Sequence, residues 1–378
     1  MEDFDWFGPL PEPGTTTVLE ASAGTGKTYT IAGMVARFVS EGVPLGQVLA
    51  VSFSRRATAE LREGIRDRLV TSRATLQRVI DGGPVGNDDV DRVLTAAEPE
   101  LLATRLGRVE QALGQVDDAP IVTLHTFAKR MLDELGLLAD HDRTVELGSD
   151  LELLADEVIA DVYLSDEQWQ RLDWAYASML GRAANSHPSE RLHPPGADCA
   201  LRVGFAEAVR AEIDRRKHVL RVLGYDDMIG RLAATLTDPD TGSAAAELLS
   251  SRFRVVLVDE FQDTDPQQWQ FLEAGFHGRA TMMLIGDPKQ AIYRFRGGDI
   301  ETYSVARARA DQVLRLGTNH RSDIAVVQGI ERLFGPIDLG TPGAAIRLTQ
   351  INARHTRPPI RGGPDQPDEM VRIRAIDT

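Results

Sequence analysis

The chain has 378 residues, of which 42% are hydrophobic and 26% charged, a balance typical of a globular protein with a large core and room for two or three domains. Its 42 Lys and Arg residues against 57 Asp and Glu give a net charge of −15, which argues mildly against nucleic acid as a partner, although a binding groove needs only local positive potential. The single cysteine, Cys199, excludes an internal disulfide, and no apolar run approaches the roughly 20 residues of a membrane span, so we expect a cytoplasmic protein without a membrane partner.

The first predicted strand, Thr17–Glu20, leads into a phosphate-binding loop and then into a helix over Tyr29–Val39. Glycines let such a loop wrap closely around an anion, and the helix N-terminus adds positive charge. Lys27 is placed to reach the β- and γ-phosphates of a nucleoside triphosphate, and Thr28 to ligate Mg²⁺. The expected nucleotide-binding residues are Ala21, Ser22, Ala23, Gly24, Thr25, Gly26, Lys27 and Thr28.

A glycine-rich turn that precedes Lys-Thr by chance is the alternative interpretation of residues 21–28. The chain has only four lysines among its 42 basic residues, so arginine is its usual cation. Lys27 is therefore not the residue that this composition would supply by drift, and a compact ammonium suits a phosphate cradle better than the arginine fork does. We favour the phosphate-binding interpretation.

Short apolar runs alternate with helical stretches along the rest of the chain, a pattern typical of an α/β fold with a doubly wound parallel sheet. Leu61, Ile65 and Leu69, for example, predict a helix over Ala57–Val70. Ligands of such folds bind at the carboxyl ends of the strands. The predicted strands are Thr17–Glu20, Val48–Phe53, Ile121–Leu124, Val255–Val258, Met282–Ile285 and Val313–Leu316.

Two largely helical stretches interrupt this rhythm, at residues 71–118 and 143–221, and we interpret both as insertions. We expect a first domain formed by residues 1–142 and 222–315, with 71–118 as its helical insertion. Residues 143–221 would form a helical accessory domain, and residues 316–378 would begin another domain.

The strand Val255–Val258 ends in two acids, Asp259 and Glu260. An acid at a strand end can hold Mg²⁺, usually through water, and its neighbour can orient or deprotonate an attacking water. Solvated acids at the end of a strand are the alternative. The upstream phosphate loop favours a nucleotide hydrolase.

Seven short motifs follow one another between residues 21 and 322: ASAGTGKT (21–28), VSFSRRATAELR (51–62), TLHTFAKRML (123–132), YDDM (225–228), VDEFQDTDPQQ (258–268), GDPKQAIYRFRGGD (286–299) and TNHRS (318–322). This ordered series resembles the UvrD-like superfamily 1 DNA helicases, and within them the RecB-like branch. The resemblance implies a RecA-like P-loop NTPase domain with a parallel sheet. It also implies that residues 316–378 are the incomplete start of a second RecA-like lobe.

The same resemblance implies that ATP and Mg²⁺ bind in a cleft between the two lobes. Lys27 and Thr28 would hold phosphate and metal, while Asp259 and Glu260 would act as the metal and water residues.

Three further residues would complete the ATP site by resemblance. Gln290 would contact the γ-phosphate and report its presence to the DNA site, and Arg321 would contact it from the second lobe as an arginine finger in cis. His320 stands where the family usually has an aromatic residue that stacks on adenine. A surface histidine is the equally weighted alternative for His320.

Aromatic and basic residues on the motif loops are suited to DNA, because aromatic rings stack on unpaired bases and cations contact the backbone. The candidates are Phe53, Arg55, Arg56, His125, Thr126, Tyr293, Arg294, Phe295 and Arg296. The alternatives are a buried strand end for Phe53, a solvated helix start for the arginines and a core histidine for His125. The basic run at residues 215–218 is interpreted as one exposed helix face.

The resemblance implies an ATP-dependent helicase subunit that moves 3′→5′ on single-stranded DNA. It would act on duplex ends in recombinational repair, inside an exonuclease complex with RecC- and RecD-like subunits. The family's later motifs and its nuclease have no match, so we expect an N-terminal fragment that binds ATP weakly and does not unwind DNA. The alternative is a module that binds ATP and DNA without motor activity. A small-molecule kinase is a further alternative, but the motifs around Gln262 and Gln290 would have no role in such an enzyme.

Overall fold

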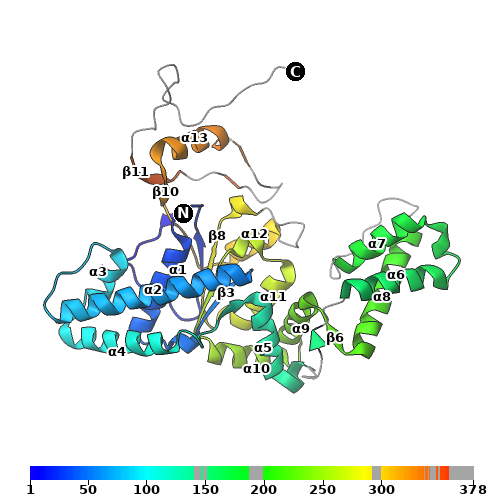
Figure 1. Cartoon of the computed structure of the whole chain (residues 1–378), viewed down its shortest axis with the longest axis horizontal. Coiled ribbons are helices and arrows are strands. Elements are labelled where there is room, and N and C mark those ends of the chain that lie inside the picture. The colour runs from blue at the N-terminus through cyan, green and yellow to red at the C-terminus, as the bar shows by residue number, and fades with distance from the viewer. Residues whose placement is uncertain are drawn as a thin grey trace, which may run out of the picture. The chain divides into compact units, whose positions relative to one another are not determined.

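The computed structural model describes residues 1–139, 146–147, 151–186, 199–291, 299–335, 337–338, 340, 346–347 and 350–356 (Figure 1). The chain forms two compact units. One comprises Met1–Phe127 together with Ala233–Thr378, and the other comprises Ala128–Leu232. The domain bounds expected from the sequence remain a prediction.

A seven-stranded parallel sheet is the centre of the first unit in the described part of the chain. Its strands, in spatial order, are β1 (Glu2–Asp3), β9 (Gln312–Arg315), β2 (Thr16–Glu20), β8 (Thr281–Gly286), β7 (Val255–Val258), β3 (Val48–Ser52) and β4 (Ile121–Thr123). The six predicted strands are confirmed to within one residue at each end, and β1 is an addition. The predicted α/β class with a parallel sheet is confirmed.

Helix α1 (Lys27–Ser40) is buried from Thr30 to Ser40 because it lies between the sheet and three further helices. These are α2 (Arg55–Ile80), α3 (Asp89–Thr95) and α4 (Pro99–Gln115). Apolar side chains of α1 and α2 share one core with inward-facing residues of β2, β3, β7 and β8. The helix that follows the phosphate loop is therefore held on every side, which fixes the loop itself.

Helix α2 continues to Ile80 and does not end at Val70 as the sequence predicts. Leu76 is buried one heptad beyond Leu69 and extends the apolar stripe of the same helix face. The residue at which the insertion was expected to begin, Thr71, therefore lies inside a continuous helix.

A second set of helices carries an aromatic cluster that packs around Phe127. Its ring lies 5.7 Å from that of Phe253 and 6.1 Å from the rings of Phe271 and Phe276, measured between centroids. Phe127 lies in α5 (Leu124–Leu135), Phe253 directly follows α10 (Gly242–Arg252), and the other two rings belong to α11 (Pro266–Phe276). The remaining helices here are α9 (Tyr225–Thr237) and α12 (Ile300–Arg309).

The last described elements form a short strand–helix–strand segment. Strand β10 (Thr318–Asp323) pairs in parallel with β11 (Asn352–His355), and α13 (Ile324–Phe334) packs against both. This segment begins three residues after β9 ends, so β10 lies directly beyond the carboxyl edge of the large sheet.

The second unit is helical and has its own core. Helices α6 (Leu151–Ser165), α7 (Trp174–Ser186) and α8 (Ala200–Leu220) pack around Phe205, Val209 and Val158, which are fully buried. No described helix is both long enough and apolar enough to cross a membrane.

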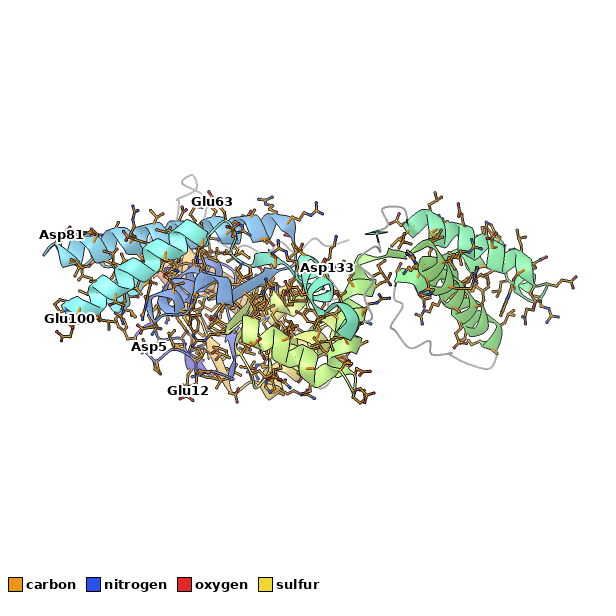
Figure 2. The ribbon with its side chains drawn as sticks, turned by 90° about the horizontal axis from the view of Figure 1, so that it is seen from below. Asp5, Glu12, Glu63, Asp81, Glu100 and Asp133 are labelled. Atoms are coloured by element: carbon orange, nitrogen blue, oxygen red, sulfur yellow. The ribbon has the colours of Figure 1, made fainter. Side chains whose placement is uncertain are left out.

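Many of the acids responsible for the net charge lie on outer helix surfaces. Figure 2 shows Glu63 on α2, Asp81 just beyond its end and Glu100 on α4, and all three are exposed. The overall charge of the chain therefore says little about the potential at the carboxyl edge of the sheet.

The N-terminal segment is fastened to the sheet and to α1. β1 pairs with β9, the Arg315 side chain bonds Asp3 at 2.5 Å, and the Trp6 ring lies against Gly33 of α1. A Cβ at Gly33 would lie 2.5 Å from Cη2 of Trp6 and 2.8 Å from Cγ2 of Val90. A glycine in the middle of a helix is required here by close packing, because any side chain would displace Trp6.

We predict that Gly33→Ala lowers the free energy of unfolding by about 1–3 kcal/mol, because overpacking outweighs the gain in helix propensity. Gly107→Ala is the matched control, since Gly107 also lies within a helix but has open space around its Cβ position. It should stabilise the protein by about 0.5–1 kcal/mol. Urea unfolding of both variants measures the difference, and equal effects would contradict the packing argument.

Candidate functional site

The chemistry-bearing residues gather at the carboxyl edge of the sheet, because parallel strands all end there. Strand β2 leads into the phosphate loop, and β7 leads into Asp259 and Glu260. Strand β8, which lies between them, leads into the segment that ends at Gln290. The next strands outward, β3 and β4, lead into Phe53 and His125.

The phosphate loop turns twice through glycines with positive φ, 81° at Gly24 and 91° at Gly26. A backbone bond from Thr25 N to Ser22 O at 3.1 Å closes the first turn, and Thr30 N reaches Gly26 O at 2.9 Å to begin α1. Residues that carry a side chain rarely adopt such φ values, so the backbone conformation requires glycine at both positions. The predicted loop residues 21–28 thus form one continuous turn between a buried strand and a buried helix.

Lys27 meets the acid pair across this edge. Its Nζ lies 2.6 Å from Oε2 of Glu260, and the Lys27 side chain is 14% exposed. Gln262 Nε2 donates to the same oxygen of Glu260 at 2.7 Å. The carboxylate is therefore held from two sides in one orientation.

Glu260 stands in an unusual backbone conformation, with φ 53° and ψ 38°. It is one of two non-glycine residues with positive φ in the described part of the chain, the other being Arg221. A left-handed conformation costs a non-glycine residue roughly 1–2 kcal/mol. Such strain gathers at functional sites, where it aims a side chain that relaxed backbone would turn elsewhere.

Asp259 is 8% exposed and follows β7 directly. Burial raises its pKa to about 6, with a further contribution from the Glu260 carboxylate. Burial and Glu260 also raise the pKa of Asp263 to about 6. One carboxyl oxygen of Asp263 is buried and finds no hydrogen-bond partner among the described residues. Three acids thus surround Lys27, and only part of their charge is offset.

A magnesium ion fits this edge only in company with phosphate and water. No group of three or more His, Cys, Asp or Glu side chains in the described ranges is arranged to hold a metal by itself. The Asp259 carboxylate is present, and Thr28 is exposed beside the loop. The hydroxyl of Ser52, which follows the Val51–Val258 pair at the end of β3, is buried without a partner among the described residues. This donor set suits a hydrated Mg²⁺, which keeps several of its waters.

Gln290 is held by a buried acid at the end of β8. Asp287 Oδ2 accepts from Gln290 Nε2 at 2.8 Å, and its Oδ1 lies 2.7 Å from Lys289 Nζ. The backbone N–H of Asp287 donates to Oε1 of Gln262 at 2.9 Å. A continuous chain of contacts therefore joins Gln290 to Glu260 through the amide of Gln262.

The TNHRS segment, which forms all but the last residue of β10, lies directly on the phosphate loop. His320 N donates to Gly24 O at 2.8 Å, and Asn319 Nδ2 donates to Ala23 O at 3.0 Å. Arg321 is exposed, and its guanidinium pairs with no carboxylate among the described residues. The segments that carry Lys27 and Arg321, predicted to face the nucleotide from opposite sides, are therefore in direct contact at the phosphate loop.

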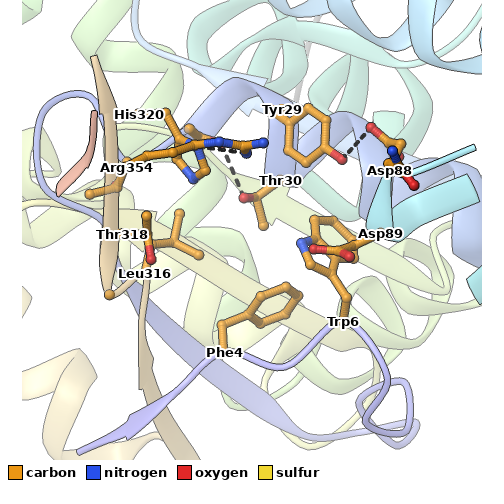
Figure 3. A pocket seen from close by; sticks show the side chains of 14 residues that line it. Phe4, Trp6, Tyr29, Thr30, Asp88, Asp89, Leu316, Thr318, His320 and Arg354 are labelled. Carbon is orange, nitrogen blue, oxygen red and sulfur yellow. Dashed lines mark hydrogen bonds between the residues drawn. The ribbon is translucent and has the colours of Figure 1, made fainter. Parts of the chain in front are cut away.

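A cavity of about 700 Å³ opens beside Thr25 and Gly26 of the loop (Figure 3). Figure 3 shows that His320 and Arg354 line one side, while the rings of Phe4, Trp6 and Tyr29 line the others. Burial lowers the pKa of His320, and the Arg354 guanidinium lowers it further. A neutral imidazole beside an aromatic wall is suited to a flat, apolar base.

Tyr29 is fixed in this cavity by a chain of polar contacts. Its hydroxyl donates to Oδ2 of Asp88 at 2.7 Å (Figure 3). Asp88 in turn accepts from Arg68 at 2.9 Å, and Arg68, which is 7% exposed, also reaches Asp91 at 2.6 Å. Helices α2 and α3 therefore set the position of an aromatic ring at the mouth of the phosphate loop.

The predicted DNA residues on β3 and β4 lie together beyond Asp259. Phe53 is half-buried between the end of β3 and Ser54, whose hydroxyl caps α2 at Ala57 N with a 3.0 Å bond. Arg55 and Thr126 are exposed, and His125 is half-buried at the start of α5. These residues follow two neighbouring strands of the sheet, and the DNA-binding role of each remains a prediction.

Other predicted residues have different outcomes. Tyr293, Arg294, Phe295 and Arg296 lie outside the described residues. Exposed Arg56 pairs with Glu60 along α2. In the basic run at 215–218, the two arginines bond Glu212 and the lysine bonds Asp227, so this helix face is paired with acids of its own unit. Arg215 is exposed as the sequence predicts, whereas the side chains of Arg216 and Lys217 are partly buried.

Several residues of the site were not predicted from the sequence: Phe4, Trp6, Tyr29, Gln262, Asn319 and Arg354. Gln262 and Asn319 stand inside recognised motifs, so their position was a usable signal. The aromatic residues near the N-terminus have no local pattern that marks them, because β1 brings them to the cavity only through long-range pairing.

Comparison with known proteins shows the family of this chain. A family model described as the UvrD/REP helicase N-terminal domain matches residues 8–311. The chain is 42% identical to the RecBCD enzyme subunit RecB of Mycolicibacterium smegmatis over 99% of this chain and 34% of that protein. It is 41% identical to the same subunit of Mycobacterium tuberculosis over 93% of this chain and 32% of that protein. An ATP-dependent DNA helicase UvrD2 of M. tuberculosis is 28% identical over 99% of this chain and 49% of that protein. The chain spans about a third of the length of the RecB relatives.

The raised pKa of Asp259 predicts a pH-dependent stability of the protein without nucleotide. The folded state holds this proton up to about pH 6, whereas the reference pKa is 3.8, so the contribution of Asp259 to stability falls as pH rises from about 4 to about 6. Asp259→Asn does not titrate and should therefore gain about 2–3 kcal/mol over wild type across that window.

Urea unfolding between pH 4 and pH 7, with a chelator present, measures this difference. Asp118→Asn, at an exposed aspartate, is the control for the loss of one carboxyl group. A difference between Asp259→Asn and wild type that stays constant with pH would show that burial does not perturb the Asp259 carboxyl group.

Proposed function

Because the chain belongs to the UvrD/REP helicase family, we propose that it is the ATP-binding motor portion of a DNA helicase. The observation that carries the proposal is the contact of Lys27 with Glu260 at 2.6 Å, beside buried Asp259 and at the end of the phosphate loop. The residues that would bind the phosphate, hold the metal and orient the water of a nucleotide hydrolase therefore lie close together.

The nucleotide would be ATP, which a helicase family uses, and Mg²⁺ would accompany it. When bound, the ion would neutralise phosphate charge and polarise the γ-phosphoryl group. Thr28 and Asp259 are the residues that would hold it, the latter through water, and the buried Ser52 hydroxyl is available to a coordinated water. The adenine base would occupy the cavity of Figure 3, against His320 and the aromatic wall.

Glu260 would orient the attacking water. A triphosphate entering the loop competes with Glu260 for the Lys27 ammonium, because the phosphate oxygens carry more charge and accept several hydrogen bonds. When Lys27 binds the phosphate instead, the Glu260 carboxylate keeps only the hydrogen bond from Gln262, at 2.7 Å. With one of its two donors gone, the oxygen that Gln262 binds would then accept a proton from the water that attacks the γ-phosphoryl group. Exchange of the Lys27 partner therefore links nucleotide binding to activation of the base.

Gln290 and Arg321 would sense the γ-phosphate from the two sides of the loop. Arg321 stabilises charge on the transferred group as an arginine finger does. Gln290 is connected to Glu260 through Asp287 and Gln262, so a change at the γ-phosphate reaches the end of β8 along hydrogen bonds.

Single-stranded DNA would pass over the loops that follow β3 and β4. Phe53 would stack on a base, as would Tyr293 and Phe295 from the segment after Gln290. Arg55, His125, Thr126 and Arg296 would contact phosphates. Strand β7, which leads to the ATP acids, is hydrogen-bonded to β3. One strand spacing, roughly 5 Å, therefore separates the nucleotide chemistry from the DNA loop.

The RecB relatives support a narrower proposal. The chain would serve a RecB-like subunit that moves 3′→5′ in recombinational repair of double-strand breaks, with RecC- and RecD-like partners and in the cytoplasm. The name of those relatives, a RecBCD enzyme subunit, is the support for the partners. The intact Lys27, Asp259 and Glu260 disfavour a module that binds ATP and DNA without turnover.

We predict that wild type hydrolyses ATP in a manner that single-stranded DNA stimulates, and that Lys27→Ala lowers the rate by about 100-fold or more. Lys217→Ala is the matched control, since its side chain is also 14% exposed and bonds a carboxylate at 2.8 Å, but in the helical unit. It should keep the wild-type rate. Steady-state phosphate release with and without DNA provides the measurement.

Binding of DNA by wild type without any turnover would instead support the non-motor module. Equal losses in Lys27→Ala and Lys217→Ala would point to damage to the fold, which circular dichroism of both variants would detect. Loss of ATP binding in Lys27→Ala alone, together with lost turnover, is the result that the proposal requires.

A further inference from the structure

The Asn319 side chain joins two parts of the molecule that the ATP site needs together. Asn319 belongs to β10 and is 8% exposed. Its amide nitrogen donates to Ala23 O in the phosphate loop at 3.0 Å. Its amide oxygen accepts from the backbone N–H groups of Arg321 at 2.9 Å and Ser322 at 2.8 Å. All three bonds come from one buried amide, so its position is fully determined.

The contact with Ala23 fixes the orientation of a loop peptide. A peptide unit is planar and trans, so the N–H of Gly24 points opposite to the Ala23 carbonyl that Asn319 binds. His320 N binds the next carbonyl, that of Gly24, at 2.8 Å. Strand β10 thus occupies loop carbonyls and leaves the Gly24 N–H turned away from itself, as a phosphate cradle requires.

The contact with Arg321 fixes the start of the arginine side chain. Acceptance from residues two and three positions ahead is an Asx-type turn, which holds the backbone at Arg321 in one conformation. A Cβ at Gly24 would lie 2.8 Å from Cβ of Arg321 and 3.0 Å from Oδ1 of Asn319. The turn therefore lies against the loop with no space between them, and glycine at position 24 permits that approach.

We infer that Asn319 is a positioning residue that sets Arg321 relative to the γ-phosphate. This inference rests on the proposed ATP site. Asn319 touches neither the nucleotide nor the metal in this arrangement, and it acts through Arg321 and through the loop peptide. Its loss would release the turn from the loop, so Arg321 would no longer meet the one group that distinguishes ATP from ADP.

A purely structural role predicts a different result. If Asn319 only fastened β10 to the first unit, its loss would weaken ATP and ADP binding by the same factor. A positioning role predicts a loss specific to the γ-phosphate. The ratio of ADP to ATP dissociation constants, measured without turnover in the presence of Mg²⁺, separates the two.

The experiment measures this ratio by displacement of a fluorescent nucleotide from the full chain. Wild type should bind ATP more tightly than ADP. Asn319→Ala and Arg321→Ala should each lower the ratio by about tenfold, and the double variant should lower it no further, because both substitutions remove one contact. Asn352→Ala, at an exposed asparagine on the neighbouring strand β11, should keep the wild-type ratio.

Asn319→Ser guards against a general loss of folding. A serine hydroxyl can still accept from the N–H groups of a local turn but is too short to reach Ala23 O, so the ratio should fall as in Asn319→Ala. Equal weakening of both nucleotides, additive losses in the double variant, a wild-type ratio in Asn319→Ser, or no preference for ATP in wild type would each overturn the inference. Failure of wild type to bind either nucleotide would instead overturn the proposed function.

Discussion

The parallel alignment of the central strands is the constraint on which the rest of this structure depends. Because β2, β8, β7, β3 and β4 all run in one direction, the segments that follow them emerge at one edge. Lys27 and Glu260 are 233 positions apart in the chain and yet 2.6 Å apart in space for this reason. The strands can be packed this way because their residues are apolar and buried on both faces. The order of the strands in the sheet therefore sets the order of the proposed site residues, from those for phosphate through those for water to those for DNA.

Much of this arrangement was predictable from local patterns. The apolar run before Asp259 predicted a buried strand with its acids at the end, and the glycines before Lys27 predicted the loop. The long-range side-chain hydrogen bonds were not predictable from local patterns. Gln262 and Asn319 act through side-chain amides, whose partners lie 25 and 296 positions away, and no periodicity marks such a pair. The end of α2 was also missed, because burial of Leu76 depends on α3 and α4, which fold over it.

Charge in this protein is organised locally. The basic run of α8 is neutralised by Glu212 and Asp227, and exposed acids cover the outer faces of α2 and α4. Arg55 and Arg321, in contrast, are exposed near the carboxyl edge of the sheet. An acidic chain can therefore still place exposed arginines where a polyanion would approach, and long-range repulsion from the other faces is screened beyond about 10 Å at moderate salt.

The left-handed backbone at Glu260 has a consequence for how this position can vary. Glycine or asparagine would relax the backbone there, whereas the proposed chemistry requires a carboxylate on a side chain of this length. Conformational preference and chemical need therefore select different amino acids at one site. A screen for thermal stability alone would drive position 260 toward a relaxed, inactive protein, so a stabilised variant of this chain should be selected with turnover as a second criterion.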